Sequence, residues 1–316
     1  MLNLDEKKIR KGKPIGLPYQ GSKKKISKKI VEIIKQNFST DKPIYDIFGG
    51  GGAITAECIL NGLEVHYNDL DKDITNVFER VISQDREWIK TLIISREEFL
   101  EIKAKENKTT DDFLKLLINS FGNKKASYMY NKEISDLKYN LAKEIIEKHD
   151  VFGGYKQTET YKRSIEKYKQ LQRLQRLQRL QQLEQLEQLQ RLQQLEQLQQ
   201  LQQLERLQQL QQLKQLDEVK ATNKSYHTFG EVSGAILYLD PPYEGTNQKG
   251  YINSFDSKEF YDWAFKMAKT NIVIISSYSI SDKRFEAVYS FDKAHSTLEG
   301  GTRNDKCEKL FMVKNS

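Results

Sequence analysis

Residues 43–69 read PIYDIFGGGGAITAECILNGLEVHYND. The run PIYDIF (43–48) predicts a buried strand, and four glycines separate it from AITAECIL (53–60), which predicts a helix start. A second short strand is predicted over residues 63–67. Strand, glycine turn, helix and strand in this order indicate a βαβ unit, and this unit decides the fold.

Further strands and helices are predicted on both sides of this unit. AILYL (235–239), NIVIISS (271–277) and KLFMVK (309–314) are apolar runs typical of strands, whereas residues 30–38 and 73–118 have helical patterns. Strands therefore occur at both ends of the chain with helical material between them. This distribution predicts an α/β fold whose parallel-type sheet is split by a long insertion.

The insertion contains a leucine repeat. From Leu171 to Leu216 every third residue is leucine, and Gln, Glu, Arg and Lys fill the spaces. The tract has no Gly or Pro, so we expect a long helix; a solenoid-like stack of short repeats is the alternative. On a helix these leucines step back by about 60° each, which is not a coiled-coil seam. They should pack on another chain, on the body of the protein or on each other.

A second interpretation of the tract is a low-complexity expansion that tolerates changes of length. It contains no candidate nucleophile, acid or metal ligand in a plausible arrangement. We therefore expect it to be dispensable for a chemical step.

Charge and cysteine content narrow the class of protein. The net charge of +7 is compatible with a polyanionic partner. Cys58 and Cys307 form neither a disulfide framework nor a metal-ligand cluster, which favours a reduced, cytoplasmic chain. The N-terminus lacks an apolar signal core, and no apolar run reaches the roughly 18 residues of a membrane span.

The strongest motif is Asp240-Pro241-Pro242-Tyr243, directly after a buried strand. Two prolines fix an extended exit from the sheet, so the Asp240 carboxylate and nearby carbonyls face the edge where ligands bind in open α/β sheets. Two acceptors and an aromatic ring suit an exocyclic amino group on a planar base. The alternative is a proline-rich strand exit with a packing tyrosine.

Two weaker motifs accompany it. The loop Asp46–Gly52 opens a helix, and Asp69 ends the next strand about 20 residues on, where acidic side chains meet ribose hydroxyls in nucleotide-type folds. A tight turn would explain the glycines as well, and Asp71 is better interpreted as a helix N-cap. The segment PYQGSK (18–23) alone indicates only a basic turn.

In this order the motifs resemble those of the Dam-like DNA adenine methyltransferases, in particular the phage and prophage type. The segments 119–134, 251–264 and 302–312 resemble the same group, so the resemblance covers nearly the whole chain. Four consecutive glycines, and Asp71 where Asn is common, depart from the family pattern. The matching motif residues are Tyr19, Gly21 and Lys23, then Asp46, Phe48, Gly50 and Gly52, then Asp69, and finally Asp240, Pro241, Pro242 and Tyr243.

The resemblance implies a Rossmann-like sheet with helices on both faces and S-adenosylmethionine as cofactor. It implies that the cofactor contacts the first three groups of motif residues, with Asp240 near its methionine end, and that Asp240 to Tyr243 are catalytic. It implies an adenine flipped out of double-stranded DNA. The corresponding division is a catalytic domain over 1–117 and 232–316, interrupted by a target-recognition insertion over 118–231.

The expected reaction is direct methyl transfer to adenine N6, for which an activated methyl needs no metal. The alternatives are an amino methyltransferase acting on cytosine N4 or RNA, and an inactive scaffold whose leucine tract recruits a partner. Self-association through residues 171–216 is a further expectation, and the expected location is the cytoplasm of a bacterial or phage-infected cell.

Overall fold

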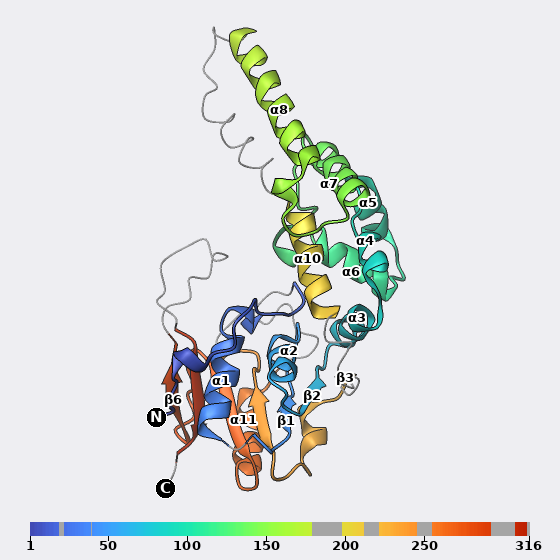
Figure 1. Cartoon of the computed structure of the whole chain (residues 1–316). Helices are drawn as coiled ribbons and strands as arrows, with labels where there is room; N and C mark the ends of the chain where they lie inside the picture. Colours follow the sequence, from blue (N-terminus) through green and yellow to red (C-terminus); the bar gives the residue numbers. More distant parts are fainter. Residues whose placement is uncertain are drawn as a thin grey trace. The chain divides into compact units, whose positions relative to one another are not determined.

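The computed structural model contains two compact units (Figure 1). The first comprises Met1–Ile82 and Gln212–Ser316, and the second comprises Ser83–Gln211. The structure describes residues 1–18, 22–38, 40–178, 198–211, 221–244, 255–291 and 307–314. Among these residues, no helix is long and apolar enough to cross a membrane.

The first unit is built on a sheet with the strand order β3-β2-β1-β4-β5-β7-β6. Strands β1 to β5 run parallel, and β7 is antiparallel to both β5 and β6. The strands are β1 (Ile44–Asp46), β2 (Val65–Asn68), β3 (Ala221–Thr222), β4 (Ile236–Leu239), β5 (Ile272–Ser277), β6 (Phe285–Ser290) and β7 (Lys309–Val313). The predicted βαβ unit and parallel-type sheet are confirmed.

The strand register brings the ends of the central strands to one edge. Asp46, the last residue of β1, pairs with Tyr67 of β2 on one side and with Tyr238 of β4 on the other. The first strand thus lies between the second and the fourth, and the chain order reverses there. In open α/β sheets, ligands bind outside the carboxyl ends of the strands at such a point.

Both faces of the sheet are covered. Helix α11 (Ser257–Met267) packs its Phe260 and Met267 against Leu237 and Leu239 of β4. Tyr238, which points to the opposite face of the same strand, is also fully buried. The remaining helices of this unit are α1 (Ser27–Asn37), α2 (Ala53–Leu60) and α3 (Lys72–Ser83), of which α1 and α2 pack on each other (Figure 1).

The second unit is helical. Among the described residues its α-helices are α4 (Arg86–Lys90), α5 (Arg96–Ala104), α6 (Thr110–Ile118), α7 (Ser135–His149), α8 (Glu159–Gln178) and α10 (Gln199–Gln211). Helix α10 contacts α4 and α6, so residues from Ser83 onward belong to this compact unit. The compact unit thus begins earlier than the insertion of 118–231 inferred from sequence, because α4 and α6, within residues 83–118, pack on the leucine tract in α10.

The leucine tract is helical where the structure describes it. Leu201, Leu204, Leu207 and Leu210 of α10 are 0% exposed, so these residues pack inside the second unit, on the body of their own chain. Packing on the body of the protein is one of the three alternatives expected for the tract. In α8, by contrast, Leu171 is half exposed. Residues 179–197 and 212–216 of the tract lie outside the described residues.

A polar side chain accompanies these leucines into the core. The Gln200 amide nitrogen donates to Asn119 Oδ1 at 2.7 Å and lies 3.0 Å from the Tyr128 hydroxyl, and Gln200 is almost completely buried. Over residues 198–211 the tract is therefore part of the core of the second unit.

Candidate active site

Polar side chains from five strands gather at the carboxyl edge of the parallel strands. Asp46 ends β1, Asp69 follows β2, Asp240 follows β4 and Ser276 lies near the end of β5. Glu308 directly precedes β7, whose antiparallel direction makes it start at this edge. Among the described residues, no group of His, Cys, Asp and Glu has an arrangement that would hold a metal ion.

Asp46 joins the first strand to the helix that follows. One carboxylate oxygen, Oδ2, accepts hydrogen bonds from the Thr55 hydroxyl at 2.7 Å and from the Thr55 backbone N–H at 3.1 Å. The side chain is almost completely buried. Burial raises the pKa of Asp46 to about 7, although the two Thr55 hydrogen bonds oppose that rise.

The glycine loop has conformations and contacts that other residues would disturb. Gly50 and Gly52 have φ angles of 48° and 69°, in the left-handed region that favours glycine. A Cβ atom on Gly52 would also lie 2.3 Å from the Phe78 ring. Core packing therefore explains Gly52 without any ligand.

Asp69 ties the glycine loop to the second strand. Its Oδ2 accepts the Gly50 N–H at 2.7 Å, and its Oδ1 accepts the Asp71 N–H at 2.8 Å. Burial raises the pKa of Asp69 to about 6, against the effect of these hydrogen bonds. Asp71 accepts the backbone N–H groups of Asp73 and Ile74, which confirms its interpretation as a helix N-cap.

Lys23 reaches the strand edge from a 3-10 helix (Lys23–Lys25). Its Nζ lies 2.8 Å from Asp240 Oδ2, 4.0 Å from Glu308 Oε1 and 4.9 Å from the centre of the Tyr243 ring. Burial alone lowers the pKa of Lys23, but Asp240 and Glu308 outweigh it, and the net pKa is raised. For Asp240, burial dominates over Lys23, and its pKa rises to about 6.

Pro241 and Pro242, directly after Asp240, lie outside regular secondary structure and are buried. The Tyr243 ring meets the Tyr278 ring edge-on, with 4.7 Å between centroids. Its hydroxyl donates to Glu308 Oε1 at 2.6 Å and lies 3.2 Å from Asp240 Oδ1. Burial raises the pKa of Tyr243, and both carboxylates raise it further.

The structure therefore brings together five of the expected site residues. Lys23 and Tyr243 both contact Asp240, and Asp46 interacts electrostatically with Asp240 and Asp69. Phe48 lies apart from their polar groups: its ring packs edge-on against Phe255 and Phe260. Tyr19 and Gly21, also expected at the site, lie outside the described residues.

Sequence reasoning missed Glu308 and its partner Ser276. The Ser276 hydroxyl donates to Glu308 Oε1 at 2.7 Å, the same oxygen that accepts the Tyr243 hydroxyl. Glu308 lies in a segment noted only for its family resemblance. Glu308 could have been found from its place directly before the last strand, β7. Because β7 runs antiparallel to β5, it begins at the edge where the parallel strands end.

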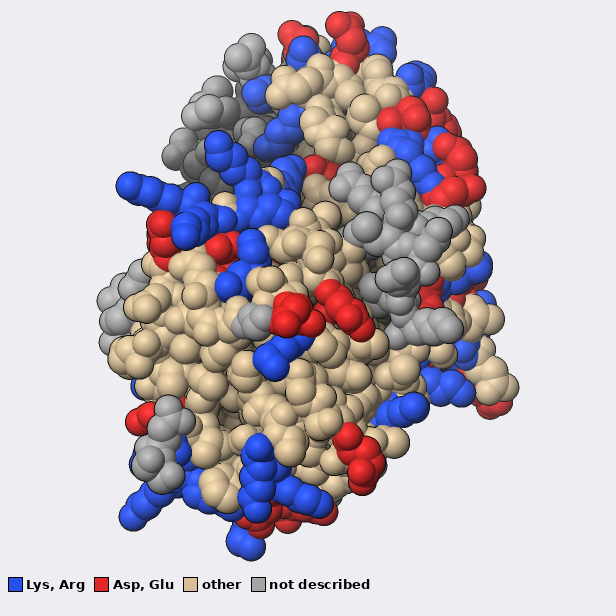
Figure 2. Space-filling view, turned by 60° about the horizontal axis from the view of Figure 1, so that its bottom comes forward, with Lys and Arg blue, Asp and Glu red and all other residues tan. Residues whose placement is uncertain are grey.

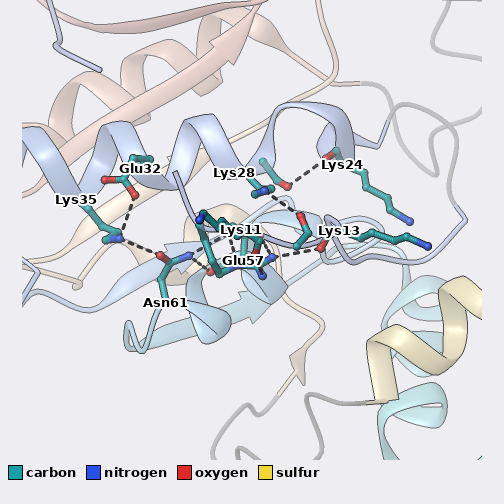
Figure 3. A network of polar contacts seen from close by, with 11 residues as sticks. Lys11, Lys13, Lys24, Lys28, Glu32, Lys35, Glu57 and Asn61 are labelled. Carbon is teal, nitrogen blue, oxygen red and sulfur yellow. Dashed lines mark hydrogen bonds and ion pairs between the residues drawn. The ribbon is translucent and has the colours of Figure 1, made fainter. Parts of the chain in front are cut away.

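A second polar network fixes the N-terminal segment near the Lys23 turn (Figure 3). The Arg10 guanidinium makes two hydrogen bonds to the buried Glu57 carboxylate, at 2.8 and 2.9 Å, and also donates to the carbonyls of Lys11 and Lys13. In Figure 3 the side chains of Lys13 and Lys24 extend in the same direction, away from this network. Hydrogen bonds from Arg10 thus brace the backbone of the segment that carries Lys11 and Lys13.

Comparison with protein families bears on this arrangement. A family model described as D12 class N6 adenine-specific DNA methyltransferase matches residues 19–300. The chain belongs to this family. The matched region includes every site residue described above except Glu308, and a comparison with curated proteins finds no match.

The protein is thus an adenine-specific DNA methyltransferase, and its family uses S-adenosylmethionine as methyl donor. The family match favours adenine over the cytosine N4 and RNA alternatives. The strand-edge cluster of this methyltransferase contains two carboxylates, Asp240 and Glu308, an aromatic ring, Tyr243, and a lysine, Lys23, that contacts Asp240.

Proposed function

We propose that the cluster around Asp240 is the catalytic centre, where the N6 amino group of an adenine flipped out of double-stranded DNA accepts a methyl group. The observation that carries this proposal is the convergence of Lys23, Asp240 and Tyr243 at the point where the strand order reverses. Lys23 holds Oδ2 of Asp240 at 2.8 Å, which leaves Oδ1 facing Tyr243 at 3.2 Å.

In this mechanism Asp240 Oδ1 and the Pro241 carbonyl accept the two amino hydrogens. These hydrogen bonds orient the nitrogen lone pair for attack as the amino group becomes tetrahedral. Nitrogen gains the methyl group, whose bond to the cofactor's sulfur would break to leave a neutral thioether. The nitrogen then loses a proton to Asp240, whose pKa of about 6 suits a base near neutral pH. The Tyr243 ring stacks on the base, a contact of about 1–3 kcal/mol.

The residues present fit S-adenosylmethionine. Asp240 and Glu308 place two carboxyl groups around one lysine, Lys23, and Asp46 interacts electrostatically with Asp240 and Asp69. The edge therefore has an acidic excess that suits the cofactor's sulfonium and ammonium charges. The Tyr238 hydroxyl is buried beneath this edge with no hydrogen-bond partner among the described residues. When bound, the cofactor supplies a sulfonium-activated methyl group.

We assign the remaining cofactor contacts to the loop from Asp46 to Gly52, together with Asp69 and Lys23. Asp69 already positions the Gly50 N–H at 2.7 Å, so its carboxylate sets the shape of the loop and lies where a ribose hydroxyl is expected. Tyr19, Gly21 and Phe48 stay in this assignment on family resemblance alone.

DNA is the substrate, and we propose that residues 119–128 of the second unit contact it. Phe121 is 63% exposed, and Asn123 and Lys125 have φ angles of 56° and 59°, a conformation costly for residues other than glycine. Buried Asn119 and Tyr128 anchor the ends of this loop. An exposed aromatic ring on an anchored loop suits insertion beside a base that leaves the stack.

Phosphate contacts complete the DNA-binding proposal. Figure 2 shows one dense group of Lys and Arg side chains, with basic and acidic side chains interspersed elsewhere on that face. Lys11 and Lys13 are exposed on the braced segment of Figure 3, and Lys25 is exposed on the 3-10 helix that carries Lys23. Contacts of this kind make DNA binding salt-dependent.

The test of the catalytic assignment is the variant Asp240→Asn. Single-turnover methylation of duplex DNA should fall by at least roughly 1,000-fold, because the amide keeps the shape but loses the charge that accepts the amino hydrogen. Asp262→Asn is the matched control, since Asp262 is an exposed carboxylate on α11. A rate for Asp240→Asn within tenfold of the parent would exclude the role given to Asp240.

A further inference from the structure

The Tyr243 hydroxyl lies between two carboxylates. It is 2.6 Å from Glu308 Oε1 and 3.2 Å from Asp240 Oδ1. A tyrosine hydroxyl has one hydrogen, so it can donate fully to only one of them. The shorter distance shows that Glu308 takes this hydrogen bond.

Glu308 is itself held firmly. Ser276, which is fully buried on β5, donates to Glu308 Oε1 at 2.7 Å, and the Lys23 ammonium lies 4.0 Å from the same oxygen. The Glu308 side chain is only 8% exposed. A carboxylate with these partners stays in one place while other groups at the site change.

The hydrogen bond between Tyr243 and Glu308 leaves the second oxygen of Asp240, Oδ1, available. Lys23 already engages Oδ2, so Oδ1 is the oxygen that remains for an incoming amino group. Without Glu308, the nearest carboxylate for the Tyr243 hydroxyl would be Asp240, and the hydroxyl would occupy Oδ1. The adenine amino group would then have to displace a charge-assisted hydrogen bond.

We propose that Glu308 is a positioning residue that draws the Tyr243 hydroxyl away from Asp240 and so keeps Oδ1 available for the N6 amino group. This proposal rests on the proposed function of Asp240. It gives Glu308 two effects: it removes a competitor for Oδ1, and it fixes the orientation of the Tyr243 ring on which the adenine stacks.

A purely structural role for Glu308 makes a different prediction. Glu308 also joins the start of β7 to β5 through Ser276, so its loss could lower activity by loosening the sheet. That effect would not depend on the Tyr243 hydroxyl. The two roles are therefore separated by asking whether the effect of removing Glu308 requires that hydroxyl.

The experiment is a double-mutant cycle of Glu308→Ala and Tyr243→Phe, measured as single-turnover methylation of duplex DNA at saturating DNA and cofactor. In the parent background, Glu308→Ala should lower the rate by between roughly 10- and 100-fold. In the Tyr243→Phe background, the same change should lower it by less than about threefold, because no hydroxyl is left to occupy Oδ1. Equal factors in the two backgrounds would overturn the proposal.

The pH dependence of the methylation rate provides a second measurement, which a loosened sheet would not shift. The negative charge of Glu308 contributes to the raised pKa of Asp240, after burial. Removing that charge should move the acid limb of the rate profile to lower pH in both backgrounds. An acid limb that stays in place in both backgrounds would contradict the close electrostatic contact on which the proposal depends.

A conservative variant of Glu308 and a control variant at another carboxylate complete the experiment. Glu308→Gln retains an acceptor oxygen without the charge, so its rate should lie between those of the parent and Glu308→Ala; should the alanine variant fail to fold, the cycle is run with glutamine. Glu286→Ala removes an exposed carboxylate from β6 and should leave the rate unchanged. If Asp240→Asn retains activity, the proposed function fails; if it is inactive but the cycle is additive, only the role of Glu308 fails.

Discussion

At the residue scale, the site depends on carboxyl groups that the fold removes from water. The pKa of Asp46 rises to about 7, and those of Asp69 and Asp240 rise to about 6, with burial as the main cause in each. Such groups cost stability in exchange for function. Their types and positions could be predicted from the sequence, because Asp69 and Asp240 follow predicted strands and Asp46 lies within one.

The buried Asp46 carboxyl should make the cofactor-free protein less stable as the pH rises. Its folded pKa of about 7 exceeds the ordinary value of 3.8, so the folded state binds the proton more tightly. Protonation of Asp46 therefore stabilises the folded state by on the order of a few kcal/mol. This contribution is fully present below about pH 4 and is lost as the pH rises through 7. Denaturant unfolding between pH 5 and 8.5 measures it.

The pH dependence of the free energy of unfolding is compared between Asp46→Asn and the control Asp262→Asn, since Asp262 is an exposed carboxylate. Asparagine at position 46 has no proton to lose, so the free energy of unfolding should vary less with pH. The same pH dependence in Asp46→Asn and in the parent would show that Asp46 does not titrate in this range.

Glu308 shows what the sequence did not provide. Its hydrogen-bond partners Tyr243 and Ser276 are 65 and 32 residues away along the chain. Only the pairing of β7 with β5 brings them together, and no local pattern around residue 308 records that pairing.

At the element scale, the predicted strands agree with β1, β2, β4, β5 and β7, and two strands were missed. β3 has only two residues, and the alternation in β6 is interrupted by an irregularity between Ala287 and Tyr289. A strand with broken period two has a weak sequence signal. The helix α11 was also unassigned, although Asp256 caps it by accepting the N–H groups of Lys258 and Glu259.

Helix α10 explains how leucines at every third position can all be buried. Steps of about 60° carry four leucines around half of the helix, so α10 must be enclosed on more than one side. Its contacts with α4 and α6 provide part of that enclosure. Sequence alone could not tell whether the enclosing surface belonged to the same chain.

Leu204→Ala should therefore destabilise the second unit by about 2–5 kcal/mol, because it leaves a cavity in a packed core. Arg206→Ala, an exposed position two residues along the same helix, should change stability by less than about 0.5 kcal/mol. Thermal and denaturant unfolding of both variants measures the difference. Similar values for the two would mean that α10 is not enclosed in solution.

The loop with Phe121 is the element proposed to act on DNA. Phe121→Ala should weaken binding to duplex DNA by about 1–3 kcal/mol, whereas Phe121→Trp, which keeps an aromatic ring, should bind like the parent. A 2-aminopurine at the target adenine should fluoresce on binding of the parent and far less on binding of Phe121→Ala. An unchanged affinity and fluorescence for Phe121→Ala would show that this ring does not enter the DNA.

At the scale of the whole molecule, the chain leaves the first unit after Ile82 and returns at Gln212. The two halves of the sheet meet between β1 and β4, and the proposed catalytic site lies at that junction. The insertion can therefore vary without changing the strand edge, provided that its own core, including α10, stays intact. The sequence indicated this split arrangement, but the boundaries follow from which helices share a core.

The most direct test of the central claim is the identity of the methylated base and its dependence on the strand-edge cluster. Duplex DNA is incubated with the protein and S-adenosylmethionine labelled in the methyl group, digested to nucleosides and separated. We expect the parent protein to place the label on N6-methyladenine, whereas Asp240→Asn, although folded, should give no labelled nucleoside. Label on cytosine, or N6-methyladenine from Asp240→Asn at the parent's rate, would contradict the central claim.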